Sequence, residues 1–152
     1  MKAHGKVVKA VPGTYAEVHR KWSPGEKIDL TLDMRCRLLE SPHGSNPAAE
    51  DHQALVRGPV VLARDENIDA HYDEPVAIVA ANGYVEVIPA TPTLSTARMQ
   101  FRVPARNGFI QMVDYASVDN WTGKHIRTWL PRTTGAASDA TAIHSAACPP
   151  PP

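Results

Sequence analysis

The sequence has no excess of charge of either sign. Its 152 residues include 16 basic and 16 acidic side chains, so the formal net charge is zero. A nucleic-acid-binding protein normally has a surplus of lysine and arginine, and electrostatic capture by an anionic membrane surface needs one too. The balanced charge therefore argues against both nucleic acid and membrane lipid as partners.

Long apolar runs are also missing. No run approaches the roughly 18 residues that a membrane-spanning helix needs. The first residues, MKAHGKVVKAV, contain no long apolar core after their first basic residue, so we expect no signal peptide. These absences leave the cellular location open.

Metal and redox motifs are absent as well. The two cysteines, Cys36 and Cys148, form no C-x-x-C pair, and no two of the seven histidines have zinc-ligand spacing to each other. Phosphate-binding loops, G-x-S-x-G elbows and H-E-x-x-H motifs are not found. A chain of this length can bury a core without disulfide or metal staples.

Proline, in contrast, is abundant. The 14 prolines are scattered along the chain, which makes long helices hard to place. Residues 28–34 (IDLTLDM) alternate strictly between apolar and polar, the pattern of a strand with one buried face. Together with the extended run 14–22 and the turn signal Ser23-Pro24-Gly25 between them, this alternation predicts a β-hairpin.

Other short runs between turn signals predict further strands. They cover residues 5–10, 53–57, 60–63, 84–88, 99–103, 109–115 and 124–130. Seven or eight short strands at hairpin spacing, without a helical stripe, predict an all-β fold: an antiparallel β-sandwich of jelly-roll-like type. We assign residues 1–132 to this sandwich. Residues 133–152, with six alanines and four closing prolines, are expected to be a disordered low-complexity tail.

The densest polar cluster is the acidic stretch 65–74 (DENIDAHYDE). Oxygen-bearing residues recur there as they do in a calcium loop. They are Asp65, Asn67, Asp69 and Asp73. Alanine and valine, however, stand where such a loop has its glycine and its bidentate glutamate. A solvated acidic loop between strands is the simpler interpretation, and calcium remains the alternative.

A second cluster, near the end of the predicted sheet, combines aromatic and polar side chains. A sugar offers an apolar C–H face and a rim of hydroxyl groups, so such a mixture suits carbohydrate. The candidate contact residues are Tyr115, Asp119, Asn120, Trp121 and Trp129. The preferred alternative is structural: Trp129 packs in the core and Trp121 caps a loop.

Four blocks of sequence together carry a family resemblance. They are GTYAEVHRKWSPGEKIDLTLDM at 13–34, ALVRGPVVLA at 54–63, VDYAS at 113–117 and WLP at 129–131. In this order they resemble the C-terminal β-domain of glycoside hydrolase family 127, the β-L-arabinofuranosidase-like proteins. The resemblance covers about residues 5–131. Neither the acidic stretch 65–74 nor the tail takes part in it.

The resemblance implies an accessory role for this chain. Such enzymes cleave terminal β-linked L-arabinofuranose with a zinc-bound cysteine nucleophile and a glutamate acid/base, both on an (α/α)6 barrel that precedes the β-domain. Neither Cys36 nor Cys148 matches that site, so no catalytic residue transfers and no cofactor is expected here.

The expected partner is therefore the catalytic barrel, with L-arabinose-containing plant glycans as a further candidate. The sequence leaves an autonomous carbohydrate-binding module open as the alternative function. A small stand-alone glycosidase is disfavoured, because no pair of carboxylates stands out.

Overall fold

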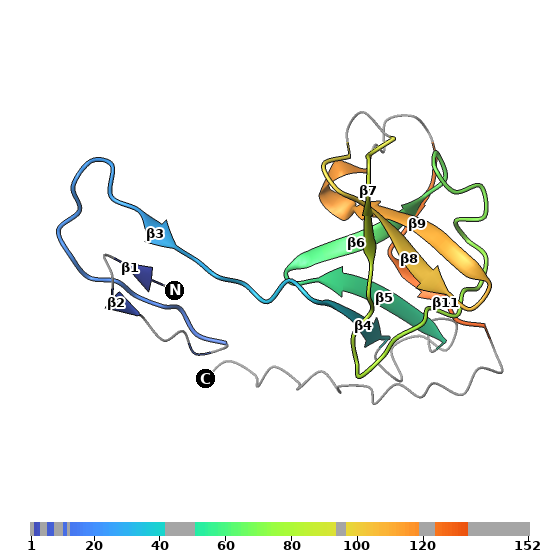
Figure 1. Cartoon of the computed structure of the whole chain (residues 1–152), viewed down its shortest axis with the longest axis horizontal. Coiled ribbons are helices and arrows are strands. Elements are labelled where there is room, and N and C mark those ends of the chain that lie inside the picture. Colours follow the sequence, from blue (N-terminus) through green and yellow to red (C-terminus); the bar gives the residue numbers. More distant parts are fainter. Residues whose placement is uncertain are drawn as a thin grey trace. The chain divides into compact units, whose positions relative to one another are not determined.

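The computed structural model of the chain describes residues 2–3, 6–7, 11, 13–41, 51–93, 97–118 and 124–133 (Figure 1). Within these residues the chain divides after Asp33 into two compact units. We call the described residues up to Asp33 the N-terminal unit and those from Met34 onward the β-unit. No helix in the described ranges is long and apolar enough to cross a membrane.

The N-terminal unit contains three strands of two residues each. They are β1 (Lys2–Ala3), β2 (Lys6–Val7) and β3 (Ile28–Asp29), and they pair antiparallel in the order β2-β1-β3. The predicted turn before β3 is present, because Gly25 has a positive φ of 85° and the Glu26 amide donates to the Ser23 carbonyl over 3.2 Å.

The hairpin predicted around that turn is wrong. Residues 14–22 form no strand, and β3 pairs with β1 instead of with them. The alternation in 28–34 predicted a buried apolar face, yet Leu30 is 63% exposed, and Ile28 and Leu32 are exposed as well. A period-two pattern buries one face only where a second layer packs on it, and the described residues of the N-terminal unit do not supply that layer.

The β-unit holds the remaining strands, which are two to seven residues long. They are β4 (Cys36–Glu40), β5 (His52–Arg57), β6 (Val60–Asp65), β7 (Ile88–Ala90), β8 (Gln100–Ala105), β9 (Gly108–Asp114), β10 (Ile126–Arg127) and β11 (Trp129–Pro131). One 3-10 turn, η2 (Tyr115–Ser117), follows β9. All pairings are antiparallel, and together they make one eight-stranded sheet.

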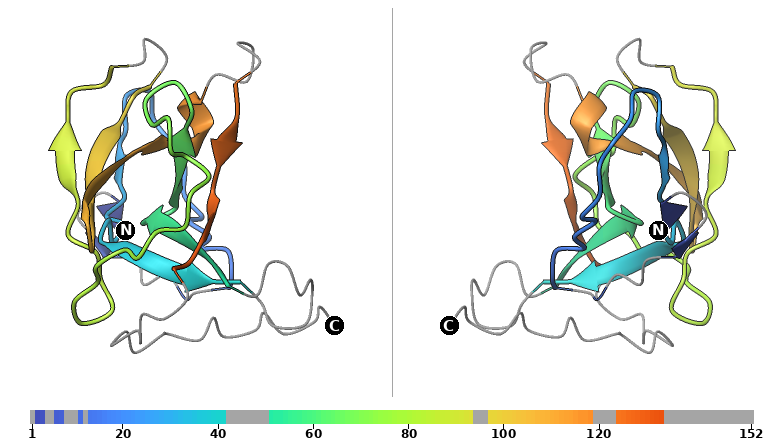
Figure 2. Two further views of the ribbon diagram at one scale, coloured as in Figure 1. Left: turned by 90° about the vertical axis from the view of Figure 1, so that its right-hand side faces the viewer. Right: turned by 90° about the vertical axis from the view of Figure 1, so that its left-hand side faces the viewer.

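This sheet curls on itself around the core (Figure 2). Its order is β11-β5-β6-β9-β8-β7; in addition, β4 pairs with β5 and β10 pairs with the end of β6. The segment between β6 and β7 helps to close the curl. It bridges β8 through Ile78 and Ala105, and it bridges β4 through Val85, whose amide donates to the Cys36 carbonyl over 3.0 Å.

The core lies inside the curl. Its fully buried members are apolar side chains contributed by five strands. They are Leu55 of β5, Leu62 of β6, Val103 of β8, Met112 of β9 and Leu130 of β11. The Asn82-Gly83 turn has positive φ at both residues, the geometry of a type I′ hairpin turn, and positions Val85 against this core.

The predicted all-β antiparallel fold of about eight short strands is confirmed. Strands β5, β6, β8 and β9 lie where the sequence places them, because glycine- and proline-containing turns mark their ends. Of the run 84–88, only Ile88 belongs to a strand, as the first residue of β7, while Tyr84 and Val85 form isolated bridges. The single sandwich over 1–132 stays a prediction, and the tail from 134 onward lies outside the described residues.

Candidate functional site

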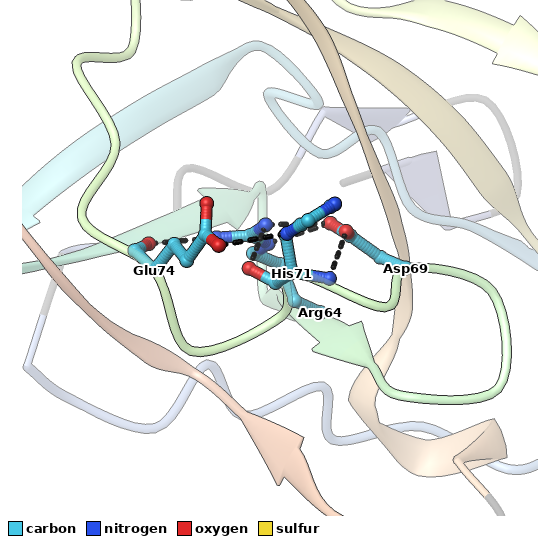
Figure 3. A network of polar contacts seen from close by, with 4 residues as sticks. All are labelled: Arg64, Asp69, His71 and Glu74. Atoms are coloured by element: carbon cyan, nitrogen blue, oxygen red, sulfur yellow. Dashed lines mark hydrogen bonds and ion pairs between the residues drawn. The ribbon is translucent and has the colours of Figure 1, made fainter.

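Arg64, at the end of β6, organises the acidic stretch 65–74 (Figure 3). Its side chain is only 3% exposed. Its Nε donates to Asp69 Oδ2 over 2.8 Å and its Nη1 to the Glu74 carbonyl over 2.9 Å, while Nη2 bonds the His71 carbonyl. A buried guanidinium needs acceptors for all its donors, and the loop folds around it to provide them. Half of the stretch is exposed all the same, including Asn67, His71 and Glu74, which agrees with the interpretation as a solvated acidic loop; Asp65 is its one buried residue.

Asp65 forms the first turn of this loop. Its Oδ1 accepts hydrogen bonds of 2.8 Å from both the amide and the side chain of Asn67, a local Asx-type turn. The side chain is completely buried, and its second oxygen, Oδ2, has no hydrogen-bond partner among the described residues.

The structure brings the calcium candidates only partly together. Asp65 and Asn67 contact each other, Asp69 is engaged by Arg64 and by the His71 amide, and Asp73 is exposed. Across the described ranges, no group of three or more His, Cys, Asp or Glu side chains is arranged to hold a metal ion.

The start of the loop is fastened to the two residues just before β10. The Glu66 carboxylate accepts from the His125 amide at 3.0 Å, from the His125 ring at 3.1 Å and from Lys124 at 3.3 Å. These hydrogen bonds, with the His125 backbone bond the largest, lower the pKa of Glu66 to about 2. The Tyr72 ring stacks on His125 with a centroid distance of 6.0 Å.

A cavity opens between this loop and the β8–β9 hairpin. Its volume is about 340 Å³. The loop contributes Asp69, His71 and Glu74 to its lining, and the hairpin contributes Arg106, Phe109 and Gln111. Sequence reasoning missed Arg64 and the whole hairpin side of this cavity. The only local signal was a charged residue ending the apolar run of β6, with acidic residues close behind it.

The carbohydrate candidates are placed only in part. Tyr115 in η2 is 50% exposed and Trp129 in β11 is 41% exposed. Trp129 therefore does not pack in the core as the structural interpretation proposed; its neighbour Leu130 does. No ring contact joins Tyr115 and Trp129 in the part of the chain that the structure describes. Asp119, Asn120 and Trp121 lie outside the described residues.

Cys36 does not suit a zinc-bound nucleophile. The thiol is free and buried at the start of β4. Burial raises its pKa, and the nearby Arg57 lowers it only in part. A metal-binding or nucleophilic cysteine needs a stabilised thiolate, which this apolar position opposes.

No protein-family model matches the chain, and neither a curated protein nor a solved structure shows significant similarity to it.

Proposed function

We propose that this chain is an accessory β-domain of a glycoside hydrolase similar to the β-L-arabinofuranosidases of family 127. Its N-terminal unit would pack on the (α/α)6 catalytic barrel of that enzyme, and the chain alone would not hydrolyse glycosides. The observation that carries the proposal is the exposed apolar surface of this unit, together with the ordered sequence blocks described above.

The apolar surface consists of large side chains at the N-terminal end of the chain. They are Tyr15, Trp22, Ile28, Leu30 and Leu32, and Tyr15 is 97% exposed. These five exposed side chains fall within residues 15–32, and a contiguous patch of such side chains is typical of an interaction surface. Burying them would gain roughly 25 cal/mol per Å² of apolar area. Three strands of two residues pair too little backbone to stabilise this unit without such burial.

A reconstitution experiment tests the proposal. The catalytic barrel of a family 127 β-L-arabinofuranosidase, prepared without its own C-terminal β-domain, is mixed with this chain. We expect the two to co-elute in gel filtration, and we expect the barrel to gain stability and activity on an aryl β-L-arabinofuranoside. The triple variant Ile28→Thr, Leu30→Thr, Leu32→Thr should lose the association, because it removes apolar area and keeps strand-compatible residues.

The matched control changes exposed apolar residues of the β-unit. Val61, Val79 and Ile88 are similarly exposed, and their replacement by threonine should leave the association intact. If the unmodified chain neither binds nor stabilises the barrel, the proposal is wrong. Equal loss in both triple variants would also contradict it, since the N-terminal surface would then have no special role.

The alternative function is an autonomous carbohydrate-binding module. The half-exposed rings of Tyr115 and Trp129 favour it, because an aromatic ring held at a surface can stack on a sugar. Millimolar arabinan, pectin and arabinogalactan oligosaccharides should then bind to the chain, and Tyr115→Ala or Trp129→Ala should abolish the binding. Absence of any signal with these glycans would reject the alternative.

A further inference from the structure

The cavity beside Arg64 has the features of a small-ligand site rather than of a packing defect. Its volume of about 340 Å³ lies at the lower end of the range of roughly 300–1,000 Å³ that small-molecule sites occupy. A packing defect inside a core is enclosed by apolar side chains, whereas this cavity carries both charged and aromatic side chains. It lies entirely within the β-unit.

The loop wall of the cavity is fixed before any ligand arrives. Arg64 bonds the carbonyl groups of His71 and Glu74 and the carboxylate of Asp69, so one buried side chain sets the path of residues 69–74 (Figure 3). Two turns add backbone hydrogen bonds of 3.0 Å: the Tyr72 amide donates to the Asp69 carbonyl, and the Glu74 amide donates to the His71 carbonyl. A site that is ordered in advance loses little conformational entropy on binding.

The hairpin wall is tied to the loop by backbone hydrogen bonds. The Arg106 amide donates to the Ala77 carbonyl over 2.9 Å, and the Val79 amide donates to the Pro104 carbonyl over 2.9 Å. These bonds fix the distance between the two walls. They use main-chain atoms only, so the Arg106 side chain is not needed for them.

Phe109 gives the cavity an aromatic wall. Its side chain is 49% exposed although it lines the cavity, and the Arg102 guanidinium lies 4.3 Å from its ring centroid. A cation over one ring face holds the ring in place. A ligand that has an apolar face would therefore gain binding free energy by covering the exposed surface of Phe109.

The polar lining favours an uncharged ligand. The Asp69 carboxylate is balanced by Arg64, and the Glu74 carboxylate lies 2.7 Å from the His71 ring nitrogen. Arg106 and the Gln111 amide add donors and an acceptor without leaving a large net charge. A neutral, hydroxyl-rich ligand can use these groups, whereas an anion would meet Glu74 and a cation would meet Arg106.

We propose that this cavity binds one neutral monosaccharide unit, either free or at the end of a glycan, with Phe109 under its apolar face and Arg106, Gln111 and Glu74 bonding its hydroxyl groups. The inference is independent of docking on a catalytic barrel. It also places sugar binding at a site other than Tyr115 and Trp129.

Amide chemical shifts of the full ¹⁵N-labelled chain test the proposal. The probes are L-arabinose, D-galactose and D-glucose, with D-galacturonate as the charged comparison. We expect at least one neutral sugar to bind with a Kd on the order of millimolar. The shift changes should be confined to residues 68–77 and 105–111, and galacturonate should bind more weakly than galactose.

Two variants and one control make the result specific. Phe109→Ala should weaken binding by about tenfold or more, since it removes the stacking wall. Arg106→Ala should weaken sugar binding by several-fold. It keeps the backbone hydrogen bond to Ala77, so it provides the test if Phe109→Ala does not fold. Leu39→Ala, an exposed apolar residue on β4 outside the cavity, should bind like the unmodified chain.

Three results would overturn the proposal. They are no shift change with any neutral sugar, tighter binding of galacturonate than of galactose, and shift changes at Tyr115 and Trp129 instead of at the cavity. None of these experiments involves the N-terminal surface, so their failure would leave barrel docking untouched.

Discussion

The N-terminal unit and the β-unit contain similar alternating segments, yet only the β-unit buries them. In β8, Phe101 and Val103 are buried while Arg102 between them is exposed. Residues 28–34 have an even stricter alternation, but Ile28, Leu30 and Leu32 remain exposed. β8 lies between β7 and β9 in a sheet that curls around a core, whereas β3 pairs over only two residues. The number of paired neighbours and an opposing layer, rather than the pattern alone, decide burial.

The largest expected difference between the units is the loss of unfolding free energy when a buried or a more exposed arginine is replaced. Arg64→Met should destabilise the β-unit by about 3–5 kcal/mol, because it leaves the largely buried Asp69 carboxylate and two loop carbonyls without their donor. In the N-terminal unit Arg20 bonds Glu26 at a more exposed position, so Arg20→Met should cost about 1 kcal/mol or less. Urea unfolding followed by far-UV circular dichroism measures both. Equal costs would contradict the contrast.

Leucines from the two units give the next largest difference. Leu62 is completely buried in the core, and Leu62→Ala should cost about 2–5 kcal/mol through lost burial and the cavity it leaves. Leu30→Ala in the N-terminal unit should change the free energy of unfolding by about 0.5 kcal/mol or less, because the side chain is exposed. The same denaturation measurement applies. A large cost for Leu30→Ala would show that the N-terminal unit buries this residue in solution.

The smallest expected effect is a pH dependence of the loop. Hydrogen bonds from His125 and Lys124 lower the folded-state pKa of Glu66 to about 2, below its ordinary value of 4.5. The stabilisation from these bonds is therefore fully present above pH 4.5 and is lost as the pH falls from 4.5 towards 2. Melting temperatures of the unmodified chain and of Glu66→Gln should differ at pH 7, and the difference should shrink below pH 4.5 and vanish only as the pH reaches about 2. A difference that grows on acidification would contradict the assignment.

Much of the β-unit could be predicted because its information is local. Glycine and proline turns mark the ends of β5, β6, β8 and β9, and Asn82-Gly83 specifies its own turn type. The candidate cavity could not be predicted in this way. Its two walls, residues 68–77 and 105–111, are about thirty residues apart, and only the sheet order brings them together. The sequence around Arg64 does not indicate whether an arginine at this strand end is buried or exposed.

The sequence by itself determined the all-β character of this protein, its turns and its neutral charge, since each depends on residue type and short-range spacing. The tertiary structure alone decided which apolar side chains are buried and which acidic ones are engaged. Leu30 and Val103 have similar local patterns but different neighbours, and Asp69 is balanced only because Arg64 lies beneath it. Burial and pairing are properties of neighbours in space, and sheet pairing chooses those neighbours over long sequence distances.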